Sequence, residues 1–374
     1  MRAMVCTDMK RNNRKMIFDI VRKERCVTRA ELSRTTGMSG PSIMTIVNEF
    51  IDLGILTASE KEAKSGELGR KPVPMLFNPD ALQSVGIEFE GNNLFVGLVN
   101  MDGEIRYQTM VKVQPNLGDA FYQSLFSCLD KLEGMMTETE KKNYLGIGFG
   151  IPGVVDPKEK RVEFAPYVGI REPADISADL NRVSDRYGKP VLIENDVNAG
   201  AAGEYYVRRI REEIQDLLYV SVGAGIGAGI ILDGKLRHGR RNLCGEIGYT
   251  VDSADQIVER SRSGRLESLL SREALCEKFE EYRQYGLVSP DMVSYMTKLL
   301  SPVIANLANA LDVDRVVVGG NLAVSAGEAL LQSLDRELEH LTLARIKLQG
   351  CRTDYTGVVG SALLASNTLM DTIF

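Results

Sequence analysis

Apolar residues in the first 78 positions recur at helical spacing in two stretches. The first stretch, RKMIFDIVRKE at 14–24, places Ile17, Ile20 and Val21 at positions i, i+3 and i+4. The second stretch is GPSIMTIVNEFIDLG at 40–54, and its apolar stripe consists of Ile43, Ile46, Val47 and Phe50. Because such spacing puts the apolar side chains on one face of a helix, we predict two helices that each bury one face.

A shorter helix is predicted between these two from its end signals. In TRAELSRTTGMS, Thr28 is followed three residues later by Glu31, which is the pattern of a capping box, and Gly37 is typical of a helix C-terminus. Ser39 then caps the third helix, a proline fits its first turn and Gly54 ends it.

The face of the third helix opposite its apolar stripe is small and polar. Thr45, Asn48 and Glu49 face away from the stripe, and Ser42 lies near the exposed N-terminal end. A helix with such a face fits the ~12 Å wide major groove of DNA. The residues of this helix expected to contact DNA are Ser39, Ser42, Thr45 and Asn48.

Residues 55–79 contain two short apolar runs around a charged, glycine-containing segment, which predicts a β-hairpin wing with Arg70 and Lys71 at its return. Residues 1–78 hold 14 Lys and Arg against 9 Asp and Glu, a net charge of +5, whereas the rest of the chain holds 31 against 42, a net charge of −11. The alternative is a three-helix module for protein interaction. Helix-turn-helix spacing, a wing and local positive charge together favour DNA binding.

Three glycine-rich segments of the remaining chain follow apolar, strand-like runs. Residues 84–105 are predicted to form a hairpin of strands with Gly86 and Gly91 near its bends. Residues 217–236 are predicted to form a second hairpin, and residues 315–324 a buried strand followed by Gly319 and Gly320. The turn of the second hairpin is predicted from Gly223, Gly225, Gly227 and Gly229. Glycine lets backbone amides approach a phosphate, but tight turns need it as well.

Five motifs in order carry a family resemblance: GIPGVVDP, ENDVNAGAAGE, GAGIGAGI, GEIG and VVVGGNLA. The chain resembles the ROK family of sugar kinases and sugar-responsive repressors. The resemblance implies an α/β fold with an N-terminal winged helix-turn-helix and a two-lobed, actin-like (ribonuclease-H-like) ROK body. The expected domains are residues 1–78 for DNA binding, 79–195 with the C-terminal helix 356–374 for the first lobe, and 196–355 for the second.

The resemblance also implies a sugar site. Asn195 matches the sugar-contacting Asn of the family and Asp196 its catalytic Asp, while Glu246 and Glu267 match sugar-contacting acids. A pocket of ionised carboxylates and an amide suits a polyol, because each oxygen can accept from a hydroxyl. Taken alone, Asn195 or Asp196 is equally well explained as a helix cap.

The sequence departs from the family where a nucleotide phosphate should lie. The usual D-x-G-G-T-K loop is replaced by residues 88–93, EFEGNN, so Glu90 stands in place of a glycine and the lysine is missing. Two like charges about 4 Å apart repel by ~1 kcal/mol in water and more in a drier cleft, so Glu90 opposes ATP. Ala224 also stands where the family commonly has Thr. We therefore expect neither ATP binding nor sugar kinase activity, with Asp196 left as a vestigial base.

The zinc motif of the family is missing too. Tyr249 holds the position of its His, and the positions of its cysteines are held by Val258, Arg260 and Arg265. These residues do not ligate zinc, so no metal is expected, and Glu267 must be positioned by packing or by salt bridges with local arginines. Tyr249 is grouped with the expected sugar-binding residues, and Tyr167 stands where an Asn is common. His238 and His340 are isolated and are expected at surface or packing positions.

Composition also bears on the expected cellular location of the protein. The six cysteines are scattered singly without a C-x-x-C pair, which favours reduced thiols, and no apolar run approaches the ~20 residues of a membrane span. We expect a cytoplasmic repressor that binds a palindromic operator as a homodimer or tetramer and takes a sugar as its effector. The alternatives are an ATP-dependent sugar kinase with a DNA-binding head and a constitutive DNA-binding protein whose body only dimerises.

Overall fold

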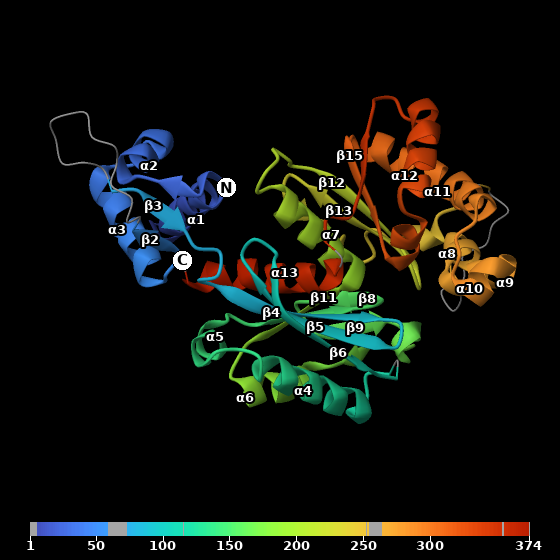
Figure 1. The fold of residues 1–374 in the computed structure, drawn as a ribbon, viewed down its shortest axis with the longest axis horizontal. Coiled ribbons are helices and arrows are strands. Elements are labelled where there is room, and N and C mark those ends of the chain that lie inside the picture. The colour runs from blue at the N-terminus through green and yellow to red at the C-terminus, as the bar shows by residue number, and fades with distance from the viewer. Residues whose placement is uncertain are drawn as a thin grey trace.

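The computed structural model describes residues 6–58, 73–114, 116–251, 253, 264–353 and 355–373. Its N-terminal part, which we call the head, packs three helices against a small antiparallel sheet of order β1-β3-β2 (Figure 1). The helices are α1 (Cys6–Glu24), α2 (Arg29–Thr36) and α3 (Gly40–Asp52). The strands are β1 (Cys26–Val27), β2 (Leu56–Ala58) and β3 (Met75–Phe77).

The end signals of the head helices are confirmed. Thr28 and Glu31 form the reciprocal capping box at α2, and Gly37 ends that helix with a φ of 69°. Ser39 caps α3 by accepting from the Ser42 amide. The core of the head is made by the predicted stripes of α1 and α3, in which Ile17 and Phe50 have no exposed surface.

The first lobe is a five-stranded sheet of order β11-β7-β4-β5-β6, in which β4, β5 and β6 are antiparallel and β7 and β11 run parallel to β4. Its strands are β4 (Gln83–Glu90), β5 (Asn93–Asn100), β6 (Ile105–Lys112), β7 (Ile147–Ile151) and β11 (Val191–Asn195). Its helices are α4 (Asp119–Glu133), α5 (Glu138–Asn143), α6 (Ser177–Tyr187) and α13 (Thr356–Ile373). A small sheet beside it contains β8 (Val154–Asp156), β9 (Arg161–Phe164) and β10 (Ala174–Asp175). The 3-10 turn η1 (Pro166–Val168) lies between β9 and β10.

The second lobe is another five-stranded sheet, of order β14-β13-β12-β15-β16. Its strands are β12 (Leu217–Val222), β13 (Ile226–Leu232), β14 (Lys235–Leu236), β15 (Arg315–Gly319) and β16 (Lys347–Gly350). Its main helices are α7 (Asp196–Arg208), α11 (Pro290–Leu311) and α12 (Asn321–Leu341). Shorter elements are the 3-10 turn η2 (Ile247–Tyr249), α8 (Arg265–Leu270), α9 (Arg272–Lys278) and α10 (Glu280–Tyr285).

The two lobes meet through α7 and α13, which lie between the two sheets, while α4 and α6 cover the far face of the first sheet and α11 and α12 that of the second (Figure 1). Glycines let the two central helices touch. A Cβ atom added at Gly203 of α7 would lie 2.8 Å from the Cα atom of Gly360, and one added at Gly360 would lie 1.8 Å from the Ala199 oxygen. The contact is therefore between backbones, which leaves little room for the helices to slide.

Three glycines predicted at bends lie inside strands instead. Gly86 is in the middle of β4, where an added Cβ would lie 1.9 Å from the Val358 oxygen of α13. Gly227 and Gly229 are in β13, where an added Cβ would press on Val197 and Ala201 of α7. These glycines make room for helices rather than for turns, and the turn between β12 and β13 retains only Gly223 and Gly225 of the four.

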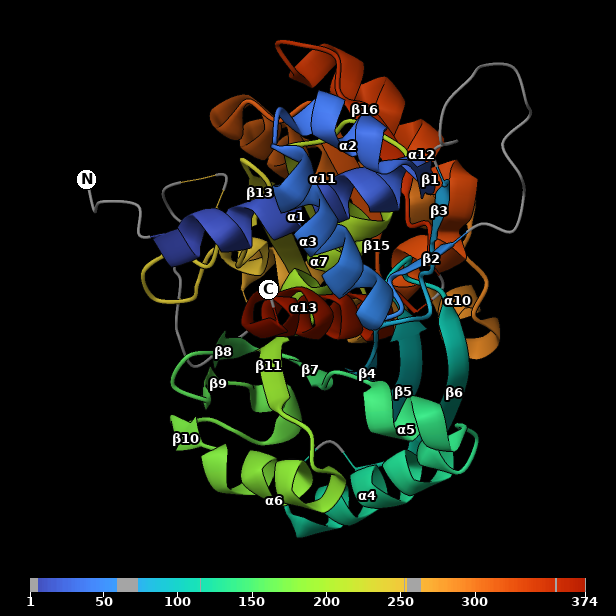
Figure 2. The same ribbon diagram turned by 90° about the vertical axis from the view of Figure 1, so that its left-hand side faces the viewer.

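The head is docked on the body through α1. Its core continues into the first lobe, because Met101 after β5 and Met370 of α13 belong to the same cluster of buried apolar residues. Arg22 is buried and donates to the Met101 carbonyl oxygen, and burial lowers the pKa of its guanidinium to about 10. Figure 2 shows the head at the C-terminal end of α13, on the side of both lobes that faces the viewer.

Polar contacts continue this docking on the same helix. Lys15 pairs with Asp371 of α13 at 2.5 Å, and Asp19 pairs with Arg209, just beyond α7, at 3.0 Å. The spacing of Lys15, Asp19 and Arg22 is i, i+4 and i+7, so a single face of α1 contacts three parts of the body. Among the helices in the described ranges, none combines the length and the apolar content that a membrane span requires.

Candidate functional site

The outward face of α3 presents the predicted polar side chains to solvent. Ser39, Ser42, Thr45 and Asn48 are all exposed. The Ser39 and Ser42 hydroxyl oxygens are 2.9 Å apart, and the Asn48 side-chain oxygen accepts from Arg29 of α2 at 3.2 Å. Exposed donors and acceptors on a helix that follows a tight turn are the arrangement that a DNA-reading helix needs.

Glu49, expected on the same outward face, is withdrawn from it. Arg14 of α1 holds its carboxylate with two hydrogen bonds of 2.7 Å, from Nε and from Nη2. The pair neutralises the charge of Glu49. The wing strands β2 and β3 pair antiparallel, whereas Arg70 and Lys71 lie outside the described residues.

A second polar cluster lies where β11 runs into α7. Asn195 caps α7 by accepting from the Asn198 amide at 2.9 Å, and its Nδ2 donates to the Gly153 carbonyl oxygen at 2.8 Å. Asp196 follows as the first residue of the helix, and its Oδ1 accepts from the Val197 amide at 2.9 Å and from Asn195 Nδ2 at 3.0 Å. Asn195 thus caps the helix, and one oxygen of Asp196 is held by a backbone amide. The interpretation as a helix cap and the interpretation as a sugar ligand are therefore compatible.

Glu246 and Glu267 converge on Asp196 from the second lobe. Burial raises the pKa of Glu246 to about 7, with further contributions from the charges of Glu267 and Asp196. Burial also raises the pKa of Tyr249, helped by the same two glutamates. Because these charges act on one another, four of the five predicted sugar-site residues lie near each other: Asp196, Glu246, Tyr249 and Glu267. The fifth, Asn195, is hydrogen-bonded to Asp196.

The expectation that all the acids of this cluster are ionised does not hold for Glu246, whose pKa lies near neutrality because it is half-buried beside two other acids. Glu267 packs against two glycines of the second lobe. An added Cβ at Gly225 would lie 2.8 Å from its Oε1, and one at Gly248 would lie 3.3 Å from its Cβ. Burial raises the pKa of Glu267, and a hydrogen bond from the Gly264 backbone opposes that rise.

Comparison with known proteins identifies this two-lobed arrangement. A model of the ROK family matches residues 84–368. The chain belongs to the ROK family. It is 26% identical over 359 residues to a xylose repressor of Caldicellulosiruptor bescii, with 88% of this chain and 87% of the relative covered. It is also 26% identical over 300 residues to a glucokinase of Halalkalibacterium halodurans, with 70% of this chain and 87% of the relative covered.

A solved structure extends the likeness of fold to the head. It is that of a ROK family transcriptional regulator described as a homologue of the Escherichia coli MLC protein, with a TM-score of 0.75 and 20% sequence identity. The alignment covers 97% of both chains. The fold predicted from the sequence, a winged helix-turn-helix on a two-lobed ROK body, is therefore confirmed. The boundaries proposed between the domains stay a prediction.

The turn that corresponds to the ROK phosphate loop joins β4 to β5 at Gly91, which has a φ of 59°. Glu88 lies against the start of α13, because an added Cβ at Gly357 would lie 2.4 Å from its Oε1. The Tyr167 ring packs on Phe89 with centroids 5.8 Å apart, and the Tyr167 hydroxyl is 3.9 Å from the Cβ position of Gly91. An aromatic side chain therefore stands beside this turn.

The zinc-binding positions of the family do not fit a zinc ion in this chain. Tyr249 and Arg265 offer no imidazole nitrogen or thiolate, and no group of three or more His, Cys, Asp or Glu within the described ranges is arranged to hold a metal. Val258 and Arg260 lie outside these ranges, so the absence of zinc stays a prediction.

His238, expected to be isolated, is paired with an acid next to the cluster. Its Nε2 lies 2.8 Å from Oε2 of Glu194, which is buried at the end of β11 and directly precedes Asn195. The two residues are 44 positions apart in the chain, so no local pattern relates them. The one available signal was that Glu194 belongs to the ENDVNAGAAGE motif while a lone acid in a strand needs a partner.

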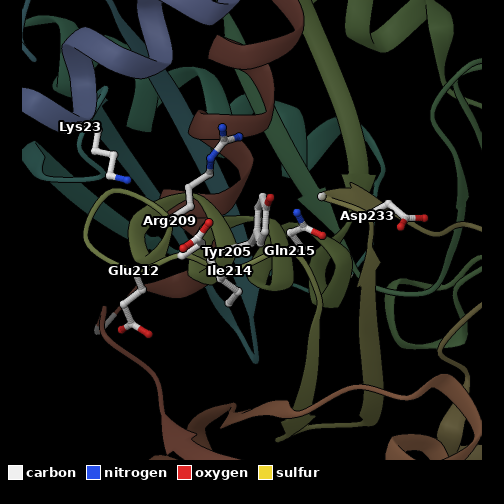
Figure 3. A pocket seen from close by; sticks show the side chains of 9 residues that line it. Lys23, Tyr205, Arg209, Glu212, Ile214, Gln215 and Asp233 are labelled. Atoms are coloured by element: carbon white, nitrogen blue, oxygen red, sulfur yellow. The ribbon is translucent and has the colours of Figure 1, made fainter. Parts of the chain in front are cut away.

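A pocket of about 540 Å³ lies between the head and the second lobe (Figure 3). Its lining includes Lys23 of α1, Tyr205 of α7, and Arg209, Glu212 and Asp233 of the second lobe. None of the three acids of the site lines it. We place the candidate ligand site at the acids, because perturbed pKa values and convergent polar groups distinguish a binding site better than a hollow of mixed charge.

Proposed function

We propose that this ROK protein is a sugar-responsive, DNA-binding transcriptional regulator. It acts as a repressor whose body binds a sugar without phosphorylating it. The head supplies the DNA-binding surface, formed by Ser39, Ser42, Thr45 and Asn48 of α3 and by Arg70 and Lys71 of the wing. The body supplies the sugar site, formed by Asn195, Asp196, Glu246, Tyr249 and Glu267.

The observation that carries this proposal is the course of α7. The helix begins at Asp196 in the acid cluster and ends at Arg208, and the next residue, Arg209, pairs with Asp19 of the head. Its 13 residues span about 20 Å. A rigid helix with a ligand site at one end and the head at the other links the two functions, because a shift at either end moves the other.

The end of α7 is held firmly enough for such a role. Arg208 and Glu204 are fully buried and paired at 2.9 Å, and Arg208 also donates to the Gly350 carbonyl oxygen at 2.7 Å. Next to them, Glu212 is bound by Arg315 and Arg352. A ligand still shifts the head only if it binds the two arrangements of the lobes with different affinity.

Four features support binding without phosphorylation. Glu90 replaces a glycine of the phosphate loop, a lysine is missing there, Ala224 replaces a Thr, and Tyr167 packs beside the turn. The name of the relative from Caldicellulosiruptor bescii agrees with a repressor. The alternative is a sugar kinase, favoured by the retained Asp196, which would then take a proton from the sugar hydroxyl.

The decisive experiment selects genomic DNA fragments on the purified protein at moderate salt and elutes them with single sugars, D-xylose first. We expect recovered fragments to share a palindrome, since a dimer sets two α3 helices about 34 Å apart. At least one sugar should change the amount of DNA retained. No sequence-selective retention at all would exclude the regulator, and retention insensitive to every sugar would favour a constitutive DNA-binding protein.

A coupled assay of ADP release with hexoses, pentoses and amino sugars separates the regulator from the kinase. We expect no turnover above that of the Asp196→Asn variant. Sugar-dependent turnover that disappears in this variant would establish the kinase instead.

The wing is tested by the salt dependence of DNA binding. Arg70→Ala and Lys71→Ala should each lower the slope of log affinity against log salt by about one, the value for one lost phosphate contact. If Arg70 instead enters a narrow minor groove, its loss also changes the sequence preference.

A further inference from the structure

The two halves of the sugar site lie on different lobes and need a device that sets their separation. Asn195 ends β11 of the first sheet, whereas Glu246 ends the loop that follows β14 of the second sheet. His238 lies in that loop, residues 237–246, and Glu194 lies in β11 beside Asn195. The hydrogen bond between Glu194 and His238 therefore joins the lobes at the edge of the site.

Both oxygens of Glu194 are committed. Its Oε2 lies 2.8 Å from His238 Nε2, while its Oε1 accepts from the Asn195 amide at 2.9 Å and from the Asn198 side chain at 3.2 Å. The Glu194 carboxylate thus contacts the second lobe through Oε2 and the start of α7 through Oε1. Only 8% of Glu194 is exposed, so water competes weakly for these bonds.

A displacement of His238 is transmitted to Glu246 because hydrogen bonds within the loop and to β13 make it compact. The Cys244 amide donates to the His238 carbonyl oxygen at 3.1 Å, and the Ala228 amide donates to the Gly245 carbonyl oxygen at 2.8 Å. Gly245 has a φ of 91°, and an added Cβ there would lie 1.7 Å from the Ala228 oxygen, so this residue is seated directly on β13. His238 and Glu246 therefore lie at opposite ends of one compact loop, with Arg237 before His238.

We propose that Glu194 and His238 are positioning residues of the sugar site, which together fix the separation between Asn195–Asp196 on one lobe and Glu246 on the other. This inference rests on the proposed function, because it assigns the pair to sugar binding. Neither residue needs to touch the sugar.

The pairing gives the site a pH dependence. The hydrogen bond to Glu194 raises the pKa of His238, burial and the charge of Lys158 oppose the rise, and the charges of Glu194 and Asp156 add to it. Asp156 and Lys158 come from the β8–β9 region and Glu194 from β11. A His with a raised folded pKa keeps the full attraction below its ordinary value near 6.5 and loses it as the pH rises through the folded value.

The pair itself is tested by proton NMR of the imidazole rings, because the chain has two histidines, His238 and His340. A His340→Gln variant assigns the two signals. We expect His238 to titrate at lower pH in Glu194→Gln than in the parent, because the hydrogen bond and the charge that raise its pKa are lost while burial and the charge of Lys158 still lower it. An unchanged titration of His238 in Glu194→Gln would overturn the pairing, whatever the protein binds.

The positioning role is tested by calorimetry with D-xylose and the sugar panel at pH 6 and pH 8. Glu194→Gln and His238→Gln should weaken sugar binding about tenfold at pH 6 and much less at pH 8. His238→Lys keeps a cation at both pH values. It should bind sugar more tightly than His238→Gln does, and its affinity should not show the difference between pH 6 and pH 8 that His238 causes in the parent. Glu246→Gln removes the acid of the site whose pKa lies near neutrality. It should weaken sugar binding at both pH values, because Glu246 is a proposed ligand, but it should keep the pH difference that His238 causes.

Asp233→Asn is the matched control, since Asp233 pairs with Arg237 at the base of the same loop at 2.8 Å but on an exposed surface. It should bind sugar as the parent does at both pH values. Parent-like affinity of both His238→Gln and Glu194→Gln at pH 6 would overturn the positioning role alone. Absence of binding of every sugar by the parent would instead overturn the proposed function and with it this role.

Discussion

On α3, Ser42, Thr45 and Asn48 are exposed on one helix, whereas Asp196, Glu246 and Glu267 are half-buried where two lobes meet. The first surface is continuous in sequence, and the second joins three segments whose outer acids are 71 positions apart. Glu49 of α3 is neutralised by Arg14, while burial, together with the charges of Glu267 and Asp196, raises the pKa of Glu246 in the body. Each surface is therefore unsuited to the ligand of the other.

The difference teaches how one chain keeps its two ligands apart. A polyanion such as DNA is attracted by a basic head and repelled by clustered carboxylates. A neutral polyol has no such preference and gains most from enclosed acceptors that solvent does not reach. Four predictions test this comparison, beginning with the largest effect.

The strongest test concerns the electrostatic strain of the acid cluster. Because the folded pKa of Glu246 is about 7 and the ordinary value is 4.5, the unfolded chain releases its proton first as the pH rises. The free energy of unfolding should therefore fall between about pH 4.5 and pH 7, by at most about 3 kcal/mol from this group. Glu246→Gln should remove this fall in urea unfolding followed at several pH values.

The pKa of His238 is also raised, so its loss of a proton at rising pH should lower the free energy of unfolding as well. His238→Gln is the control for that contribution. If the pH dependence of unfolding is the same in Glu246→Gln and the parent, the acids do not interact as the structure indicates, and the contrast with α3 disappears.

The next test removes one charge from the site and none from the head. Asp196→Asn keeps the Oδ1 atom that accepts from Val197, so the start of α7 should be preserved. Loss of a charged acceptor should weaken sugar binding by roughly 1.5 to 3 kcal/mol, about 10- to 150-fold. Calorimetry measures this loss, and DNA binding without sugar should not change.

Asp130→Asn is a suitable control for this charge change, because Asp130 pairs with Arg186 on the far side of the first lobe. A weaker DNA affinity in sugar-free Asp196→Asn would contradict the separation of the two surfaces.

The corresponding test on the head is Asn48→Ala. The side chain is exposed and contacts Arg29 through a 3.2 Å hydrogen bond, so its loss should leave the fold intact. Specific DNA binding should weaken by roughly 1 to 3 kcal/mol, the value of a base contact, with sugar binding unchanged. Binding to all fragments at the parental strength would show that another residue reads the operator.

The smallest effect is expected where the two regions are joined. Asp19 and Arg209 are partly exposed, so breaking their pair should change stability by roughly 0.2 to 1 kcal/mol. We expect Arg209→Asp to reduce the effect of sugar on DNA affinity a few-fold, and Asp19→Arg in the same chain to restore it. The measurement is DNA affinity with and without the eluting sugar.

Reversal of the Asp130–Arg186 pair, which touches neither the head nor α7, should leave the sugar response unchanged. A full sugar response in Arg209→Asp alone would mean that the two regions are coupled by another route.

Local signals in the sequence were sufficient for the head. The capping box of Thr28 and Glu31, the left-handed Gly37 and the apolar stripe of α3 each depend on neighbours within a few positions. Motif order was sufficient for the ROK body, and it is also the basis on which Asn195, Asp196, Glu246 and Glu267 are predicted to bind a sugar. These features are visible in a sequence because secondary structure and its caps are decided by nearby residues.

Only the tertiary structure decided the rest. Gly86, Gly227 and Gly229 look like turn residues until α13 and α7 are seen pressing on their strands. Glu194 meets His238 across 44 positions, and Glu246 acquires its pKa from burial beside acids of other segments. Close backbone approach, ion pairing and desolvation are properties of groups brought together in space, so the order of residues along the chain does not reveal them.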